Sequence, residues 1–241
     1  MLNDADTIQR YPRRHPANTN LHLYYEDTFE GFPLMRGKGP FIREYLSELR
    51  HTIELALAEY PRVLAFRVDL RLPRGIELPD CAYTNQVISR FFESFTRKIQ
   101  YHQGRVGERG YARGCKVRYV WSRETGQEGK QHYHLLILLN RDAYYTVGRL
   151  GAERVNMIDR LQEAWASALG LSVWLVEGLV HIPDKATYRV DRKPRERKVA
   201  GSERKVLVNE LPALFYRASY LCKVATKSYG DRQRGFGTSR G

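Results

Sequence analysis

The chain has 241 residues, which suits one large domain, and 42% of them are hydrophobic, enough to build a folded core. Lysine and arginine number 40 against 27 aspartates and glutamates, and the formal net charge of +13 favours a polyanionic partner: nucleic acid first, an anionic membrane surface second. No stretch approaches the roughly 18 apolar residues of a membrane-spanning helix, and the first residues lack the pattern of a signal peptide, so we expect neither feature.

The three cysteines are scattered along the chain, at Cys81, Cys115 and Cys222. They show neither the Cys-x-x-Cys spacing of a zinc site nor an even count. We therefore expect a protein of a reducing compartment, the cytoplasm, without a cysteine-based metal site.

The N-terminal third predicts an irregular segment followed by a helix. Residues 1–40 are polar and interrupted by prolines and glycines, and we expect them to form an irregular arm. Residues 41–60 repeat large apolar side chains at every fourth position from Phe41 to Leu57, which predicts an amphipathic helix. Pro61 would end this helix.

A strand is predicted over residues 62–72, where apolar residues alternate with Arg67, Asp69 and Arg71. Two interpretations of the polar face stay open. It is either a solvated sheet face or a surface that contacts DNA phosphates beside an active site.

The middle of the chain predicts a helix and a hairpin. Residues 82–102 have apolar side chains at helical spacing, and a glycine-rich basic loop follows. Residues 115–123 predict a strand, and residues 124–130 a polar turn. Residues 130–140 hold a short apolar run closed by an asparagine, which predicts a buried central strand. We expect the two strands to pair as an antiparallel hairpin.

Three further elements are predicted in the C-terminal third: a helix over residues 152–169, a strand over 171–182 and a helix from 211 to about 228. Together with the preceding elements they indicate an α+β fold, an antiparallel sheet of four to five strands with flanking helices.

Two basic segments flank the last helix. Residues 185–205 predict an exposed hairpin or loop with Arg192, Lys193 and Arg195 as candidate DNA contacts, although such a run is usually only a solvated surface. Residues 231–241 are rich in glycine and arginine and predict a flexible tail. The expected domain therefore spans residues 41–230.

The entrance of the central strand carries a candidate metal site. His132 and His134 are two residues apart, so on a strand they share one face while Tyr133 takes the other. Two imidazoles suit Mn, Zn, Ni or Co, and an oxygen ligand would extend the choice to Mg. Glu124 lies across the predicted hairpin and is the preferred third ligand, with Glu128 and Asp69 as alternatives. A pair of half-buried histidines on a sheet face is the competing interpretation.

The last predicted helix carries candidate nucleophiles. Tyr216 and Tyr220 are four residues apart, with Lys223 and Lys227 continuing the same face. A tyrosine hydroxyl has a pKa of about 10 and needs a neighbouring positive charge to act as a nucleophile at neutral pH. Tyr220 is preferred because Lys223 follows it by three residues. Lys227 is a further candidate DNA contact, and core packing of both tyrosines is the alternative.

This ordered set resembles the three motifs of HUH endonucleases, the rolling-circle replication initiators and relaxases. The motifs are the strand from Phe66 to Leu72, a glutamate ahead of Gln-His-Tyr-His-Leu-Leu-Ile-Leu, and Ala-Ser-Tyr-Leu-Cys-Lys ending at Lys223. The most similar group is the inovirus gene-2-like group, which includes the YagK/YfjJ C-terminal domain proteins of phage and prophage.

The resemblance implies a metal-dependent enzyme that nicks and rejoins single-stranded DNA at a replication origin. The histidines and Glu124 would hold Mg or Mn against the scissile phosphate while a tyrosine attacks, leaving a 5′-phosphotyrosyl link. The chain has no G-x-x-x-x-G-K-[ST] motif, so duplex unwinding would need a helicase of the bacterial host. The alternative function is a basic nucleic-acid-binding protein with an unused or decayed site.

Overall fold

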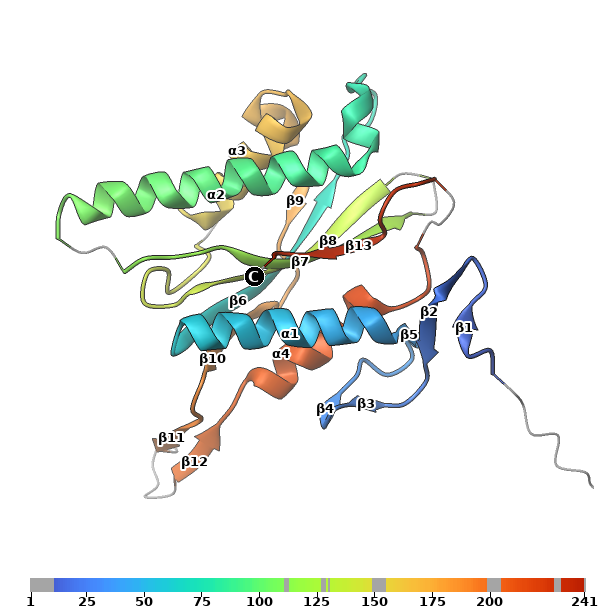
Figure 1. The fold of residues 1–241 in the computed structure, drawn as a ribbon. Coiled ribbons are helices and arrows are strands. Elements are labelled where there is room, and N and C mark those ends of the chain that lie inside the picture. The colour runs from blue at the N-terminus through green and yellow to red at the C-terminus, as the bar shows by residue number, and fades with distance from the viewer. Residues whose placement is uncertain are drawn as a thin grey trace, which may run out of the picture.

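The computed structural model describes residues 11–110, 113–126, 129, 131–148, 155–198, 205–227 and 231–240. Its centre is a six-stranded antiparallel sheet in the order β10-β6-β8-β7-β13, with β9 also paired to β6 (Figure 1). The strands are β6 (Arg62–Arg71), β7 (Arg118–Thr125), β8 (Gln131–Asn140), β9 (Val180–His181), β10 (Thr187–Asp191) and β13 (Phe236–Thr238). The predicted α+β fold class is confirmed.

Helices cover both faces of this sheet (Figure 1). One face packs against α2 (Asn85–Gly107) and α3 (Met157–Leu169). The other packs against α1 (Arg43–Glu59) and α4 (Leu211–Ala218), which continues into the 3-10 turn η3 (Ser219–Cys222). Two more 3-10 turns are η1 (Asp80–Tyr83) and η2 (Val173–Val176). No helix in the described part of the chain has both the length and the apolar character needed to cross a membrane.

The strand β8 separates two hydrophobic cores. Tyr133 and Leu135 belong to the core under α2 and α3, whereas Leu136 and Leu138 belong to the core under α1 and α4. Because side chains alternate along a strand, the histidines at even positions of β8 face the α1/α4 side. Both sides of β8 are covered, which explains why its sequence is a continuous apolar run beyond the histidines.

The N-terminal segment is not irregular over its described residues. Its strands are β1 (Arg14–His15), β2 (Asn18–Tyr24), β3 (Thr28–Phe29), β4 (Phe32–Pro33) and β5 (Phe41–Ile42). β1, β2 and β5 form a three-stranded sheet, and β3 pairs with β4. The prediction of an irregular arm over residues 1–40 is wrong there, because Phe29 and Leu34 are buried in the α1/α4 core and hold the segment against the body.

The C-terminal segment also belongs to the fold. β13 pairs with β7, and the Phe236 ring is buried and stacked on Tyr45 at a centroid distance of 4.2 Å. The prediction of a flexible tail is therefore wrong for residues 231–240. The buried Phe236 ring and the pairing with β7 hold this edge strand on the sheet.

Two other predicted elements are shorter than expected. Of the strand predicted over residues 171–182, only β9 forms, because the first half of that range contains the 3-10 turn η2. The last helix stops being α-helical at Ala218, tightens into η3 and becomes extended at Lys223. Tyr216 and Tyr220 therefore do not continue one α-helical face.

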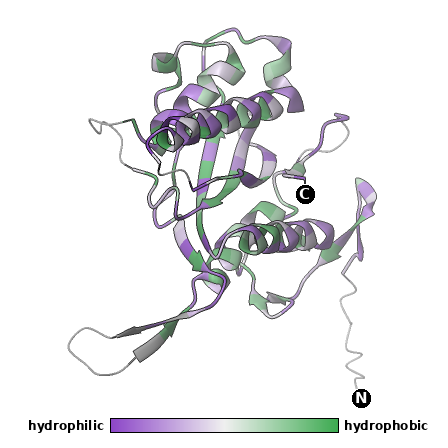
Figure 2. Cartoon of the chain, turned by 60° about the vertical axis from the view of Figure 1, so that its left-hand side comes forward, coloured by the Kyte–Doolittle hydropathy of each residue, from purple (hydrophilic) through white to green (hydrophobic). Residues whose placement is uncertain are grey.

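The basic segment predicted to be an exposed hairpin divides into two parts. β10 joins the edge of the central sheet, beside β6. β11 (Arg195–Lys198) and β12 (Lys205–Val208) then pair as a two-stranded ribbon that projects from the body (Figure 2).

Candidate metal centre and nucleophile

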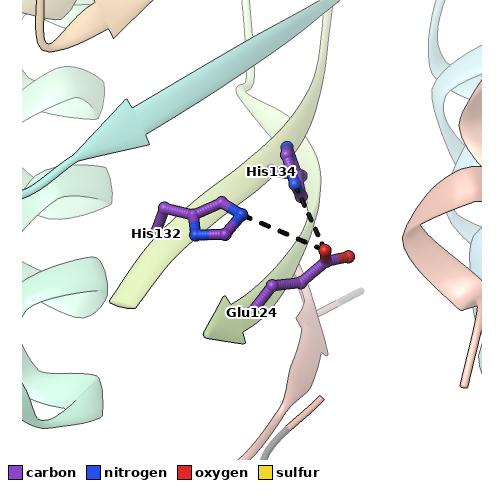
Figure 3. A group of neighbouring side chains, drawn as sticks. All are labelled: Glu124, His132 and His134. Atoms are coloured by element: carbon purple, nitrogen blue, oxygen red, sulfur yellow. Dashed lines mark ion pairs between the residues drawn. The ribbon is translucent and has the colours of Figure 1, made fainter. Parts of the chain in front are cut away.

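Three predicted ligands converge on one face of the sheet (Figure 3). In the strand register Glu124 of β7 lies opposite His132 of β8, and His134 follows two residues later on the same face. Glu124 Oε2 lies 4.0 Å from His132 Nε2 and 3.5 Å from His134 Nε2. One ligand atom from each residue lies within 4.8 Å of the others. The strand period and the short hairpin are what bring the three side chains together.

The donor set fits a divalent cation. The Glu124 side chain is only 2% exposed, and its Oε1 atom has no hydrogen-bond partner among the described residues. His134 Nε2 is also buried without a hydrogen bond in that part of the chain. Buried polar atoms are normally paired, so an unsatisfied atom on each of two converging ligand residues favours an ion at this site. Two imidazoles and a carboxylate accept Mn, Zn or Mg.

A second carboxylate fixes the orientation of His134. Asp69 of β6 lies opposite His134 in the register, and its Oδ1 atom is 2.6 Å from His134 Nδ1. A carboxylate only accepts, so Nδ1 carries the proton of this hydrogen bond and Nε2 is the atom turned toward Glu124. Asp69, which the sequence offered as an alternative third ligand, thus orients the candidate ligand His134 and is not itself one of the three converging side chains. Glu128, the other alternative, lies outside the described residues.

The charges of the cluster are strongly coupled. Burial alone would raise the pKa of Glu124, but the close contact with His134 and its charge, the Thr226 hydroxyl and Lys227 outweigh burial and lower that pKa to about 2. Burial would lower the pKa of His134, yet Asp69 and Glu124 raise it. The carboxylate is therefore ionised at neutral pH, and a cation must compete with a proton on His134.

Tyr220 and Lys223 lie beside this cluster. The Lys223 ammonium donates to the Tyr220 hydroxyl at 2.6 Å and lies 2.9 Å from Glu124 Oε2. The Tyr220 ring meets the His134 ring edge-on at a centroid distance of 5.2 Å. Residues three apart are eclipsed in a 3-10 turn, so η3 places Lys223 over Tyr220. One ammonium thus joins the phenol to the carboxylate of the candidate metal site.

Tyr216 has a different environment. Its side chain is 37% exposed on α4, and its backbone carbonyl accepts a hydrogen bond from Ser219 Oγ at 2.7 Å. No contact described for the chain joins Tyr216 to Glu124 or the histidines. The break in the helix at Ala218 separates the two tyrosines, which leaves Tyr220 as the tyrosine of the cluster.

The strand residues predicted to meet DNA phosphates have unequal surroundings. Arg67 is 5% exposed, donates to Asp69 Oδ1 at 3.1 Å and lies with its guanidinium carbon 5.0 Å from the Tyr220 ring centroid. It is therefore part of the wall of the site and not of a solvated sheet face, and its contact with DNA stays a prediction. Asp69 is likewise engaged with Arg67 and His134, whereas Arg71 is exposed at the end of β6.

The other candidate DNA contacts also differ from one another. The Lys227 side chain is fully buried, with its ammonium 4.0 Å from Glu124 Oε1, so it faces the carboxylate instead of the surface. The Arg192 guanidinium donates to the backbone carbonyls of Leu57 and Ala58 and caps the C-terminal end of α1. Lys193 is exposed, and the side chain of Arg195 lies outside the described part.

The model of the YagK/YfjJ C-terminal domain matches residues 24–239. The chain belongs to the YagK/YfjJ C-terminal domain family. Two relatives from Escherichia coli strain K12, both described as uncharacterized, are YagK, 33% identical over 208 residues, and YfjJ, 30% identical over 211 residues. Each alignment covers 84% of this chain, and the alignments cover 95% of the length of YagK and 97% of the length of YfjJ. The resemblance to inovirus gene-2-like proteins stays a prediction.

This YagK/YfjJ-family chain also overlaps in part with a solved viral structure. The N-terminal nuclease domain of minute virus of mice non-structural protein 1 is described as having a Zn²⁺ ion in its active-site pocket and as recognising DNA at the origin of replication. The overlap covers 67% of this chain and 77% of that one, at 12% identity and a TM-score of 0.30. No function can be transferred at that level of similarity.

Sequence reasoning missed one residue of the site. Thr226 donates its hydroxyl to Glu124 Oε2 at 2.5 Å, from the extended segment after η3. The sequence around this threonine carries no motif that would reveal the contact. The position of Asp69 was easier to predict from the sequence, because the alternation of β6 already places it on the polar face shared with Arg67.

Proposed function

We propose that this YagK/YfjJ-family protein nicks and rejoins single-stranded DNA through a 5′-phosphotyrosyl intermediate on Tyr220, as a replication initiator of a phage or prophage. The observation that supports this most is the position of Lys223, whose ammonium reaches both the Tyr220 hydroxyl and Glu124. A tyrosine oxygen, a fixed positive charge and a set of metal ligands are the groups that this chemistry needs.

In the proposed reaction the Tyr220 oxygen attacks the scissile phosphorus and the bond between phosphorus and the 3′-oxygen breaks. The ammonium of Lys223 stabilises the phenolate, so the phenolic proton goes to solvent, and the departing 3′-oxygen takes a proton from solvent. One phosphate ester is exchanged for another. The reverse reaction by the free 3′-hydroxyl therefore rejoins the strand without ATP.

Glu124, His132 and His134 would hold the divalent cation, Mg or Mn by preference. When bound there, such a cation withdraws charge from a non-bridging phosphate oxygen. Asp69 keeps His134 in the orientation that presents Nε2. Arg67, buried against Tyr220, adds a second positive charge to the wall beside the reacting hydroxyl.

The test is a covalent protein–DNA adduct. Wild-type protein, incubated with single-stranded origin DNA and Mn²⁺ or Mg²⁺, is expected to give a band that survives denaturing electrophoresis. Tyr220→Phe should abolish the adduct while DNA binding stays close to normal, since the change removes one oxygen and keeps the ring. Tyr216→Phe is the matched control and should still form it.

Two results would count against the proposal. An adduct that persists in Tyr220→Phe and maps to Tyr216 would reassign the nucleophile. DNA binding without any adduct in wild-type protein, with either metal, would favour the alternative of a non-catalytic nucleic-acid-binding protein, which the net charge of +13 also fits.

A further inference from the structure

A basic groove lies between α2 and α3. These two helices cover one face of the sheet (Figure 1), and the candidate metal site lies on the opposite face. Its cavity volume is about 840 Å³. Five arginine and lysine side chains line it against two glutamates: Arg90, Arg97, Lys98, Arg105 and Arg160 against Glu93 and Glu163. The proposed nicking chemistry uses none of these residues.

The two glutamates of the groove are already paired. Glu93 accepts from Arg97 at 2.6 Å, one turn along α2. Glu163 of α3 accepts from Lys98 of α2 at 2.6 Å. The positive charges of Arg90, Arg105 and Arg160 therefore remain in excess within the groove. Arg105 has only a distant ion pair, with Glu108 at 3.9 Å. The groove therefore favours an anionic occupant.

An exposed aromatic ring accompanies this charge. Tyr101 lines the groove and is 71% exposed, so its ring is accessible to a ligand. Beside it, the His102 ring is fixed by Tyr144, whose hydroxyl lies 2.9 Å from His102 Nδ1. Cationic side chains around an accessible ring form the usual platform for single-stranded nucleic acids, whose unpaired bases stack on aromatic faces.

We propose that the α2/α3 groove binds a segment of single-stranded nucleic acid at a second site, away from the metal cluster. Phosphates lie against Arg105 and Arg160, and a base stacks on Tyr101. Duplex DNA fits this surface less well, because its bases are already stacked inside the helix and leave the ring without a partner. The proposal concerns the substrate class of the proposed function and does not require its chemistry.

The test measures binding without catalysis. Fluorescence anisotropy with fluorescein-labelled dT20 is recorded over a series of salt concentrations, in EDTA, with the 241-residue chain carrying Tyr220→Phe as the parent. Tyr101→Ala in this parent should weaken binding about fivefold or more and leave the salt dependence unchanged, since it removes stacking alone. Arg105→Gln should reduce the slope of log affinity against log salt by about 0.7, the loss of one phosphate contact.

Tyr145→Ala is the matched control, because Tyr145 is 65% exposed and does not line the groove. It should bind dT20 like the parent. Parent-like binding and salt slope in both groove variants would overturn the proposal, whether or not the wild type forms an adduct. Equal affinity of the groove for a poly-glutamate peptide would also overturn it, because the groove would then select charge and not nucleic acid.

Discussion

Oδ1 of Asp69 lies 2.6 Å from Nδ1 of His134, on the side of the ring away from Glu124. The contact spans two neighbouring strands, because Asp69 of β6 and His134 of β8 are directly paired in the register. Carboxylates that bind the second nitrogen of a metal-ligating histidine fix its tautomer and increase its basicity. We infer the same role for Asp69, which the buried Arg67 holds in turn.

The first prediction follows from this pair. Asp69→Ala should weaken Mn²⁺ binding by about 10- to 100-fold, because the His134 ring loses the partner that presents Nε2. Asp69→Asn keeps an acceptor oxygen and should lose less. Isothermal titration calorimetry measures both, with the exposed Asp184→Asn as the control. A lower melting temperature of the metal-free variant with an unchanged Mn²⁺ affinity would show a structural role alone.

A second prediction separates the chemistry from metal binding. Lys223→Met removes the ammonium that bridges the Tyr220 hydroxyl and Glu124. Adduct formation on bound DNA should slow by about 100- to 1,000-fold, the usual effect of losing one charge-stabilising donor. The Mn²⁺ affinity should not fall, since Glu124 loses only a competing cation.

The control for this prediction is Lys227→Met. Lys227 is also buried, but its ammonium lies 4.0 Å from the other oxygen of Glu124. We expect a smaller loss of rate. A parallel loss of adduct-formation rate and of Mn²⁺ affinity in both variants would mean that both lysines act by positioning Glu124. The specific role proposed for Lys223 would then be wrong.

The convergence of the three candidate metal ligands was predictable from the sequence because their positions depend on local rules. A strand repeats every two residues, so His132 and His134 had to share a face. The short turn then fixed which residue of β7 would lie opposite them, and Glu124 is that residue. For Asp69, strand alternation predicted the face of the sheet on which it lies, but not the strand with which it pairs.

The contacts in the C-terminal half of the site were harder to predict from the sequence. Tyr220 and Lys223 do meet, but through a 3-10 turn and not through the α-helical face that their spacing suggested. Thr226 reaches Glu124 from a residue 102 positions away, and such a contact depends on the whole fold. Arg67 is buried beside the Tyr220 ring, a contact that no pattern within β6 reveals.

A third prediction tests the pairing of β13. An ideal Cβ at Gly237 would lie 2.7 Å from the Trp121 ring, which is directly opposite in the register. Gly237→Ala should therefore destabilise the protein by about 1–3 kcal/mol, because the buried indole must shift. Urea denaturation measures the change. Gly235→Ala, whose Cβ would lie 3.9 Å from Lys227, is the control and should have little effect. Equal stability of all three proteins would mean that β13 does not hold the tail in solution.

The last prediction concerns the pH dependence of folding stability, at a pair remote from the site chemistry. The buried Arg118 guanidinium donates to both oxygens of Glu59, at 2.5 and 3.2 Å. These hydrogen bonds, with the charges of Arg118 and Lys116, lower the pKa of Glu59 below its ordinary 4.5 even though burial opposes the shift. The folded protein therefore holds this carboxylate ionised more strongly than the unfolded chain does. The stability gained is fully present above the unfolded pKa and is lost as pH falls through the lower, folded pKa.

Glu59→Gln should accordingly lower the free energy of unfolding by about 2 kcal/mol at pH 7, since it weakens a charged hydrogen-bond pair and leaves Arg118 with a neutral partner. Acidification through and below pH 4.5 should narrow the gap between variant and wild type, because the wild-type carboxyl group then protonates as well. Urea denaturation at pH 7 and in acid measures both values. The exposed Glu54, paired with Arg50, supplies the control, and Glu54→Gln should change stability little at either pH. A gap that stays constant from neutral to acid pH would contradict the prediction, because the contribution of Glu59 would then come from packing and not from its charge.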